Sequence, residues 1–232
     1  MNFKSLDAKQ WSRMGPRAMF GQFMMNIAKK NKKLMVLSAD LGRSSGLARF
    51  KVEFPDQYLS VGISEQNLVD CATNYSCMGC DGGWPDKAMQ YVIDNKGLDT
   101  ESSYPYQGTD NDCQYNKSMV GATIHNYTML PAGNMSVLYE AIATVGPISV
   151  ALDAEYDFQM YSSGIFESTA CSSEQLDHAV LAVGYGVSAS GKKYLIIKNS
   201  WDTVWGMDGY IYFSTDIDDM CGISQHSSYP IV

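Results

Sequence analysis

Two short motifs in the C-terminal half of the chain carry side chains that together suit nucleophilic catalysis. One is Asp177-His178, and the other is Asn199-Ser200-Trp201. In such chemistry a thiolate attacks a carbonyl carbon, a histidine holds the proton, and an amide or carboxylate orients the imidazole. His178 and Asn199 are therefore a candidate base and its orienting residue. The first of the six cysteines is Cys71, so no thiol nucleophile precedes that position.

The elements that must position these residues can be predicted from local composition. Segments rich in β-branched and aromatic residues and broken by glycine turns predict strands, at 148–152, 178–187, 194–198 and 209–213. Helical periodicity covers 85–95 and 136–145. We expect an antiparallel, barrel-like domain with two helices.

The N-terminal segment has a different pattern. Apolar residues at helical spacing predict a helix over 14–31, and short apolar segments at 34–40 and 58–62 predict two strands. Helices alternating with strands indicate an α/β arrangement with a parallel sheet.

Charge also separates the two parts of the chain. Residues 1–60 carry eleven Lys and Arg against four Asp and Glu, a net of +7, whereas the remainder has a net of −15. One interpretation of such a change in net charge along the chain is a basic arm that binds nucleic acid. The basic residues are spread along a helical pattern and form no basic tail, so we expect no nucleic-acid partner.

All six cysteines follow residue 70, which favours an oxidising compartment for this part of the chain. The N-terminus has no apolar segment typical of a signal peptide, and no segment is long and apolar enough to span a membrane. We therefore expect no membrane association, and the sequence shows no route to an oxidising compartment.

Residues 64–232 resemble the papain family of cysteine peptidases, and most of all its cathepsin L-like branch. The resemblance rests on motifs in family order: Ser64-Glu65-Gln66-Asn67-Leu68-Val69-Asp70-Cys71, Gly79-Cys80-Asp81-Gly82-Gly83, Ser103-Tyr104-Pro105-Tyr106, Val145-Gly146-Pro147, Asp177-His178-Ala179-Val180, Lys198-Asn199-Ser200-Trp201, Trp205-Gly206, Cys221-Gly222-Ile223 and Ser228-Tyr229-Pro230. It implies an α+β fold, with a papain-like β-barrel lobe and part of the helical lobe.

The resemblance also implies roles for single residues. His178 would be the general base, Asn199 its orienting partner and Trp201 the shield over their hydrogen bond, with Trp205 supporting the site. The residues expected to bind an extended peptide or protein substrate, or a protease inhibitor, are Gly82, Gly83, Trp84, Pro85, Asp177 and His226. In the family His226 would form the floor of a side-chain pocket, where an imidazole suggests a preference for acidic side chains.

Several family features are absent or altered. The nucleophilic cysteine and the oxyanion-hole glutamine belong before Ser64 and are missing there, so we expect no peptide hydrolysis by the usual route. Asp202 replaces a glycine in a turn that could need positive φ.

By resemblance Cys71 pairs with Cys113 and Cys171 pairs with Cys221. Cys77 and Cys80 could bond to each other, stay reduced or cross-link chains; zinc would need two more ligands, so no metal is expected.

Residues from about 10 to 69 resemble the pyrimidine-binding domain of transketolase-type thiamine diphosphate enzymes. The matching motifs are Arg13-Met14-Gly15-Pro16-Arg17, Ser38-Ala39-Asp40-Leu41, Phe54-Pro55-Asp56 and Val61-Gly62-Ile63-Ser64-Glu65-Gln66-Asn67. In that family Glu65 would hydrogen-bond the aminopyrimidine of the cofactor. The diphosphate-binding domain with its metal ligands has no counterpart here, so we expect no bound cofactor.

Six residues, 64–69, satisfy both resemblances and are the expected junction. The predicted domains are a transketolase-like α/β fragment over 1–63 and an incomplete papain-like domain over 64–232, joined as a chimera of two unrelated genes. Three functions follow: a cysteine endopeptidase by family that is inactive as written, a non-catalytic pseudopeptidase that binds peptides or inhibitors, and a thiamine diphosphate-dependent fragment. The family of the second domain implies a lysosomal or extracellular location.

Overall fold

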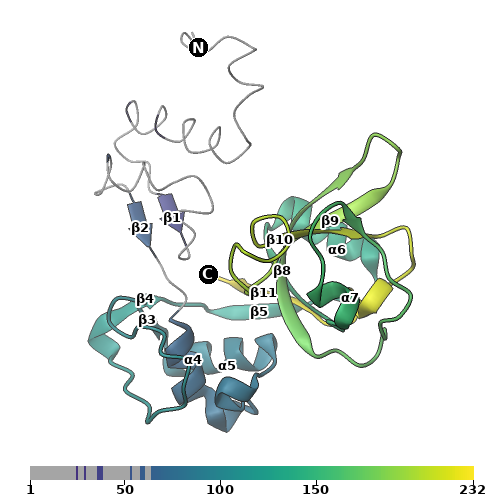
Figure 1. Cartoon of the computed structure of the whole chain (residues 1–232). Helices are drawn as coiled ribbons and strands as arrows, with labels where there is room; N and C mark the ends of the chain where they lie inside the picture. Colours follow the sequence, from purple (N-terminus) through teal and green to yellow (C-terminus); the bar gives the residue numbers. More distant parts are fainter. Residues whose placement is uncertain (1–24, 26–28, 30–35, 39–52, 54–57, 61–63) are drawn as a thin grey trace. The chain divides into compact units, whose positions relative to one another are not determined.

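The computed structural model describes residues 25, 29, 36–38, 53, 58–60 and 64–232 (Figure 1). The chain divides into two compact units. The first comprises Met1–Asp70 and Leu98–Ala122, and the second comprises Cys71–Gly97 and Thr123–Val232. The helix predicted over 14–31 lies outside the described residues, except that Met25 and Lys29 are helical.

The first unit contains two pairs of short strands. Strands β1 (Val36–Ser38) and β2 (Tyr58–Ser60) pair in parallel, with Val36 opposite Tyr58. This pairing confirms the two parallel strands predicted from the apolar segments. Strands β3 (Leu98–Asp99) and β4 (Val120–Ala122) pair antiparallel. Helix α4 (Glu65–Cys71) and the 3-10 helix η4 (Lys117–Met119) complete the described elements of this unit.

A buried polar network holds α4 against the chain that follows it in this unit. The Gln66 side chain is fully buried, and its Nε2 donates to Asp70 Oδ1 and to the Thr109 carbonyl, both at 2.7 Å. Its Oε1 accepts from the Gln107 N–H at 2.8 Å, and the Tyr104 hydroxyl donates to Asp70 Oδ2 at 2.8 Å. Each buried polar group therefore has a partner, as stable burial requires.

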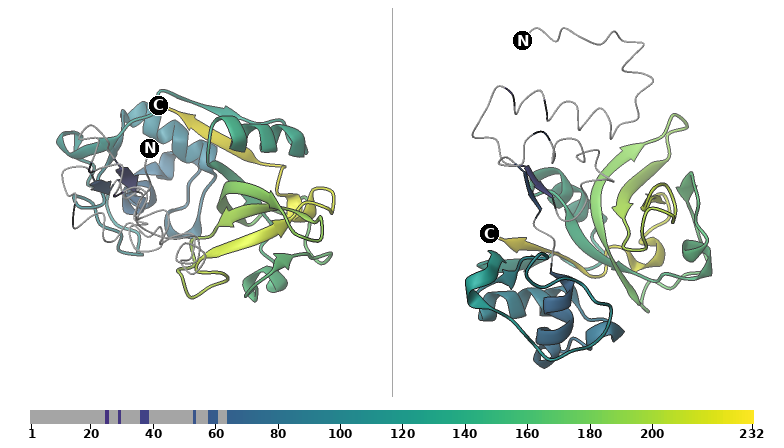
Figure 2. Two further views of the ribbon diagram at one scale, coloured as in Figure 1. Left: turned by 90° about the horizontal axis from the view of Figure 1, so that it is seen from above. Right: turned by 60° about the vertical axis from the view of Figure 1, so that its left-hand side comes forward.

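A seven-stranded sheet forms the main part of the second unit, in the order β5-β11-β6-β8-β9-β10-β7. Neighbours are antiparallel except for the parallel pair β10 and β7. The strand bounds are β5 Asn126–Met129, β6 Ile148–Leu152, β7 Ile165–Phe166, β8 His178–Val187, β9 Lys193–Lys198, β10 Tyr210–Ser214 and β11 Ser227–Ile231. The four predicted strands are confirmed with shifts of at most one residue at their ends. Figure 2 shows the ribbon from two further sides.

Helices of the second unit begin at residues suited to their positions. Helix α5 (Pro85–Asn95) has proline at its first turn, where the missing N–H costs nothing. Helix α6 (Met135–Thr144) is capped by Asn134, whose side chain accepts from the Val137 N–H. Helix α7 (Tyr156–Gln159) is short, and the 3-10 helices are η2 (Ala72–Tyr75), η3 (Gly79–Asp81) and η5 (Met220–Gly222).

The core of the second unit lies on the sheet, under α6 and α7. Its fully buried side chains include Leu138, Ile148, Leu152, Phe158, Leu195, Ile197, Ile211, Phe213 and Ile223. The alternating burial along β9 places Leu195 and Ile197 on one face of that strand, and along β10 it does the same for Ile211 and Phe213. No helix among the described residues is long and apolar enough to cross a membrane.

The cysteines follow the predicted pairing where the structure describes it. A disulfide joins Cys171 and Cys221, which confirms that prediction. Cys71 and Cys113 are both disulfide-bonded. Cys77 and Cys80 form no disulfide with each other, which leaves the reduced and the cross-linking alternatives.

Candidate functional site

Adjacent strands bring His178 and Asn199 together. His178 is the first residue of β8, Asn199 directly follows β9, and the two strands pair antiparallel. His178 Nε2 donates to Asn199 Oδ1 at 2.8 Å, and Asn199 is 5 % exposed. In this tautomer the other ring nitrogen, Nδ1, keeps its lone pair for a reacting group or ligand. The predicted base and orienting residue thus lie in hydrogen-bonding contact.

Aromatic rings enclose this hydrogen bond. The Trp201 ring stacks on His178 with a centroid separation of 4.7 Å and an interplanar angle of 27°. The buried Phe158 ring approaches His178 at 6.1 Å and Trp201 at 5.6 Å, edge to face. Trp205 contacts both Trp201 and Phe158, and its indole N–H donates to the Gln159 carbonyl at 2.9 Å. These rings fix the imidazole plane and limit the access of water to the hydrogen bond.

The turn after Trp201 adopts the backbone conformation that the replaced glycine suggested. Asp202 has a φ of 63°, in the left-handed region. Aspartate tolerates this region better than most residues because its short side chain bonds locally. Its carboxylate accepts from the backbone N–H and the hydroxyl of Thr203. Trp201 therefore keeps its position over His178 despite the substitution.

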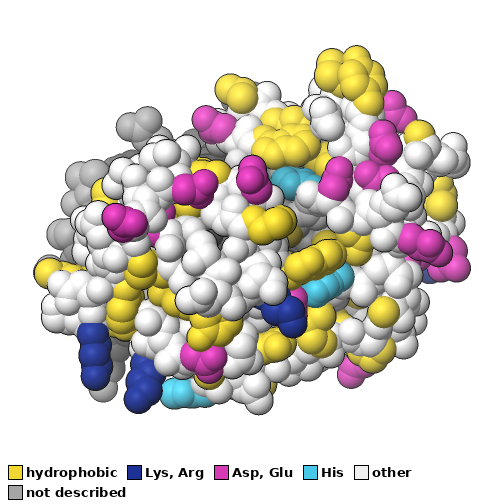
Figure 3. Space-filling view, turned by 90° about the horizontal axis from the view of Figure 1, so that it is seen from below, with side chains coloured by type: hydrophobic (Ala, Val, Ile, Leu, Met, Phe, Trp, Pro, Cys, Tyr) yellow, Lys and Arg dark blue, Asp and Glu magenta, His cyan; other side chains and the backbone are white. Residues whose placement is uncertain are grey.

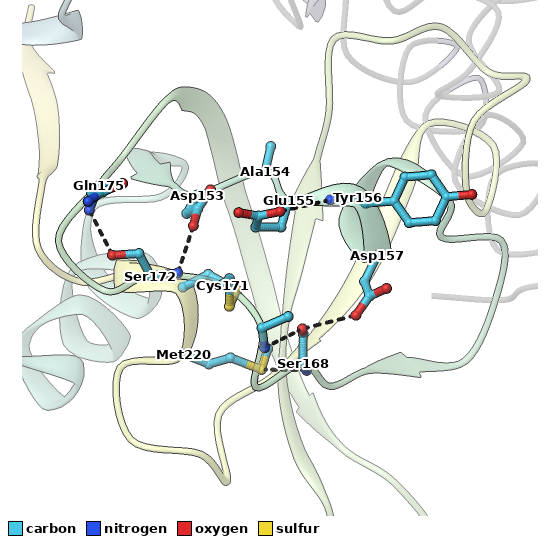
Figure 4. Close-up of a disulfide and its surroundings, with 12 residues drawn as sticks. Asp153, Ala154, Glu155, Tyr156, Asp157, Ser168, Cys171, Ser172, Gln175 and Met220 are labelled. Carbon is cyan, nitrogen blue, oxygen red and sulfur yellow. Dashed lines mark hydrogen bonds between the residues drawn. A yellow bond between two sulfur atoms is a disulfide. The ribbon is translucent and has the colours of Figure 1, made fainter.

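The loop that leads into His178 is fastened to strand β6. Asp177 Oδ1 accepts from the Ala154 N–H at 2.8 Å. Buried Asp153 accepts from the Ser172 N–H at 2.6 Å and donates its own N–H to the Cys221 carbonyl at 3.0 Å. Figure 4 shows Asp153 and Ser172 beside the disulfide. The Asp177 carboxylate, predicted to bind substrate, thus also anchors the segment that carries the imidazole.

Gly82 and Gly83, in the predicted peptide-binding segment, occupy positions that require glycine. Gly82 has φ 101° and ψ −167°, a conformation essentially restricted to glycine. A Cβ at Gly83 would lie 2.8 Å from Cys77 Sγ. Both residues are exposed, and the Gly83 backbone makes no hydrogen bond within the described chain. An extended peptide could therefore pair with this backbone.

The predicted pocket residues form a second cluster at the start of α5. The rings of Trp84 and His226 stack with centroids 4.5 Å apart and an interplanar angle of 12°. His226 Nε2 lies 3.2 Å from Asp86 Oδ1, and Lys87 Nζ lies 3.2 Å from Asp86 Oδ2. Pro85 is the first helical residue and sets the direction of Trp84. On the face shown in Figure 3, imidazoles lie against hydrophobic side chains.

Asp86 and Phe158 belong to these clusters although no motif of the sequence singled them out. Asp86 occupies the second position of α5, where an acidic residue ordinarily indicates only a favourable interaction with the helix dipole. Phe158 lies on the four-residue helix α7, which is too short to give a periodic signal. Their proximity to His226 and His178 arises from contacts between segments far apart in the sequence.

The Cys77 thiol does not resemble an activated nucleophile. Burial raises the pKa of the Cys77 thiol, and the nearby Asp86 charge raises it further, whereas reactive cysteines have a lowered pKa. Cys80 is exposed. No three His, Cys, Asp or Glu side chains are grouped for a metal ion in the part of the chain that the structure describes. Glu65, the predicted cofactor contact, is exposed in the first turn of α4 in the other unit.

Comparison with known families gives two matches. The model of the papain family cysteine proteases matches residues 50–231, and that of the transketolase pyrimidine binding domain matches residues 13–81. The two matched ranges overlap over residues 50–81, which include the predicted junction.

Relatives at high identity match the papain-like part of the chain. A cathepsin L-like peptidase of Aedes aegypti is 50 % identical over 173 residues, which are 74 % of this chain and 51 % of that protein. Cathepsin L1 of Drosophila melanogaster is 49 % identical over 173 residues, or 74 % of this chain and 47 % of that protein. Digestive cysteine proteinase 1 of Homarus americanus is 49 % identical over 174 residues, or 74 % of this chain and 54 % of that protein. The chain thus spans about half the length of these relatives.

Solved structures share the fold. Digestive procathepsin L2 from the larval midgut of Tenebrio molitor superposes with a TM-score of 0.72 at 38 % identity, covering 80 % of this chain and 58 % of that one. Bromelain from Ananas comosus in complex with the E64 inhibitor gives a TM-score of 0.65 at 40 % identity, covering 72 % of this chain and 76 % of that one. With these identities and a family match over residues 50–231, the chain belongs to the papain family of cysteine proteases and is cathepsin L-like.

Proposed function

We propose that this chain is a papain-like pseudopeptidase that binds extended peptides or protease inhibitors without hydrolysing them by the thiolate route. The observation that carries the proposal is the His178–Asn199 hydrogen bond of 2.8 Å under Trp201, formed in a chain whose first cysteine is Cys71. Four of the six cysteines are in disulfides, and the pKa of Cys77 is raised. Loss of the nucleophile from such a triad costs about a millionfold in turnover.

Each part of the site retains a chemical role in binding. Nε2 of His178 is engaged by Asn199, so Nδ1 is the ring atom that would meet a bound carbonyl or inhibitor group. The exposed backbone of Gly83 would pair with an extended peptide, which needs close approach and no side chain, whereas the Gly82 N–H and C=O already bond to Gly79 and Met78. Trp84 would line a side-chain pocket that has His226 at its floor.

The experiment measures hydrolysis and binding separately. Purified protein is incubated with a fluorogenic dipeptide substrate at pH 5 to 7, with and without an irreversible thiol-directed epoxide, and extended peptides are titrated by calorimetry. We expect no turnover, no covalent label, and peptide binding that H178A weakens at least about tenfold. H125A is the matched control, because His125 is an exposed histidine remote in sequence from both motifs. Epoxide-sensitive turnover, or no peptide binding up to millimolar concentration, would overturn the proposal.

We further propose that the chain is a chimera with its junction within residues 64–69, between domains 1–63 and 64–232. The overlap of the two family matches over this stretch supports the junction. On the peptidase side, Gln66 and Asp70 belong to the buried network with Tyr104. Sequencing of transcripts from the source tests this: two separate parents should diverge within these codons, and one uninterrupted locus covering all 232 codons would contradict an artefactual fusion.

The disulfides and the relatives named as cathepsins and digestive proteinases support a lysosomal or extracellular location. Cell fractionation with antibodies against residues 64–232 would check this location. Recovery of the native chain from the cytosol alone would contradict it.

A thiamine diphosphate-dependent function is a second candidate, favoured by the match over residues 13–81. Glu65 is the one residue that corresponds to a cofactor contact, and it is exposed on the surface of α4. Saturable quenching of tryptophan fluorescence by thiamine diphosphate, abolished in E65A, would support this candidate against the first.

A further inference from the structure

Four asparagines of the chain stand in the tripeptide that accepts N-linked oligosaccharides, which is Asn-X-Ser/Thr with X other than proline. They are Asn74, Asn116, Asn126 and Asn134. All four are exposed. Because this tripeptide is common by chance and an attached glycan is bulky, the surroundings of each asparagine decide whether it suits a glycan.

Three of these tripeptides show no contact between the asparagine and its own hydroxyl residue in the described structure. Asn74 lies within η2. Asn126 begins β5, and its Oδ1 accepts from the N–H of the next residue, Tyr127. Asn134 uses its Oδ1 to cap α6 at the Val137 N–H. The side-chain oxygens of Asn126 and Asn134 thus serve the backbone and not the hydroxyl of the tripeptide.

Asn116 differs, because its side chain is joined to the hydroxyl of its own tripeptide. Its Oδ1 accepts from the Ser118 N–H at 3.0 Å and from the Ser118 hydroxyl at 2.7 Å. Nδ2 of Asn116 donates no hydrogen bond within the described part of the chain. The amide oxygen is therefore engaged inside the tripeptide, and the amide nitrogen, to which a glycan attaches, stays accessible.

The backbone of Asn116 is held by the rest of its unit. Asp99 on β3 is 3 % exposed, and its Oδ2 accepts from the Asn116 N–H at 3.0 Å. A hydrogen bond to a carboxylate is stronger than one between neutral groups. The Asn116 carbonyl accepts from the Met119 N–H at 2.8 Å. Both backbone groups of Asn116 are bonded to the protein while its side chain is exposed, so a glycan on Nδ2 would displace no packed group.

We propose that Asn116 is an N-glycosylation site of this protein. The co-reactant is an oligosaccharide linked through a diphosphate to a polyprenol. Nδ2 attacks the anomeric carbon, and the new carbon–nitrogen bond forms as the bond from that carbon to the diphosphate oxygen breaks. The polyprenyl diphosphate leaves, and the proton of Nδ2 passes to a base of the transferring enzyme. The proposal rests on the proposed lysosomal or extracellular location, because such acceptors are modified in secreted proteins.

Lys117 allows the tripeptide to be destroyed without changing Asn116 or Ser118. K117P places proline at the middle position, which abolishes acceptance. Asn116 has φ −127° and ψ 107°, extended values that suit a residue before proline. Lys117 is also the first residue of η4, a position that proline tolerates. K117Q is the matched control, because it removes the same cation and keeps the tripeptide.

The test uses the full chain, secreted from insect cells behind a cleavable signal sequence. Glycans are released by an amidase in heavy-oxygen water, which marks each formerly occupied asparagine for peptide mass spectrometry. The native chain and K117Q should carry the mark at Asn116 in the majority of molecules, whereas N116Q and K117P should lose it. An unmarked Asn116 in the secreted native chain would overturn the proposal, and so would a mark at Asn116 that persists in K117P.

The same mass spectrometry on chain purified from its source distinguishes failure of this inference from failure of the proposed location. A glycan on Asn116 there supports both. Cytosolic chain without this glycan contradicts the location, and the secreted chain then decides the acceptor by itself. Chain recovered from lysosomes or from the extracellular medium with an unmodified Asn116 would overturn the glycosylation site and leave the location standing.

Discussion

Removal of the Cys171–Cys221 disulfide should destabilise the second unit strongly. The bond closes a loop with a sequence separation of 50 residues. In the chain-entropy model, a loop of this size restricts the unfolded chain by about 4 kcal/mol at 25 °C, between the values for short and very long loops. Because a whole domain is typically stable by only about 5–15 kcal/mol, the loss would be a large fraction of the total.

Native contacts near the disulfide would persist in the variant and keep the folded state similar. The bonds of Asp153 to the Ser172 N–H and the Cys221 carbonyl use backbone groups, and the anchor of Asp177 to Ala154 is independent of sulfur. The effect should therefore fall mainly on the unfolded state. The imidazole of His178 should keep its position whenever the variant is folded.

The assay is urea unfolding of C171A/C221A, followed by tryptophan fluorescence, since Trp84, Trp201 and Trp205 all lie in the second unit. C77A is the matched control for loss of a cysteine side chain without loss of a cross-link. We expect a decrease of about 4 kcal/mol for the double variant with little change in the control. A decrease below about 1 kcal/mol with an unchanged denaturant dependence would refute the entropic reasoning.

Three further predictions concern the glycine segment, its thiol neighbour and the polar network. G83A should cost about 1–3 kcal/mol because its Cβ would contact Cys77 Sγ, and the further change C77A should recover part of that loss. G82A should cost a similar amount through backbone strain, and C77A should recover none of it. Urea unfolding of the two double variants measures the recovery, and equal recovery in both would contradict the prediction. Burial raises the pKa of Cys77, so its alkylation rate should rise with pH at a midpoint above that of free cysteine, as mass spectrometry can follow. Because the pKa of the Cys77 thiol is higher in the folded than in the unfolded chain, its contribution to stability is fully present below the unfolded pKa and is lost as pH rises through the folded pKa. An alkylation midpoint at or below that of free cysteine would contradict the prediction. Y104F should cost about 1.5–3 kcal/mol by removing the donor to the buried Asp70 carboxylate, and a loss under about 0.5 kcal/mol would show that water replaces the hydroxyl.

Local sequence determined the elements that carry the site. β-Branched and aromatic residues over 148–152 and 178–187 predicted β6 and β8, and helical periodicity over 85–95 predicted α5. These signals succeed because neighbouring residues set the periodicity and the backbone preference. Motifs also identified His178 and Asn199, since their residue types and order are recorded in the chain itself.

Tertiary contacts decided what these residues touch. The Asp86 carboxylate looked like an ordinary helix-start acid, and only the fold places it 3.2 Å from the His226 imidazole. The expected preference for acidic side chains at His226 stays a prediction. Phe158, which lies against both His178 and Trp201, had no periodic signal because α7 has four residues.

The sequence by itself therefore determined the family, four strands and two helices of the second unit, and the identities of the candidate base and orienting residue. The tertiary structure alone decided the 2.8 Å contact between His178 and Asn199 and the 3.2 Å approach of His226 to Asp86. The physical reason is that backbone preference is a property of neighbouring residues, whereas the charge and hydrogen-bond partners of a side chain depend on which distant segments pack against it.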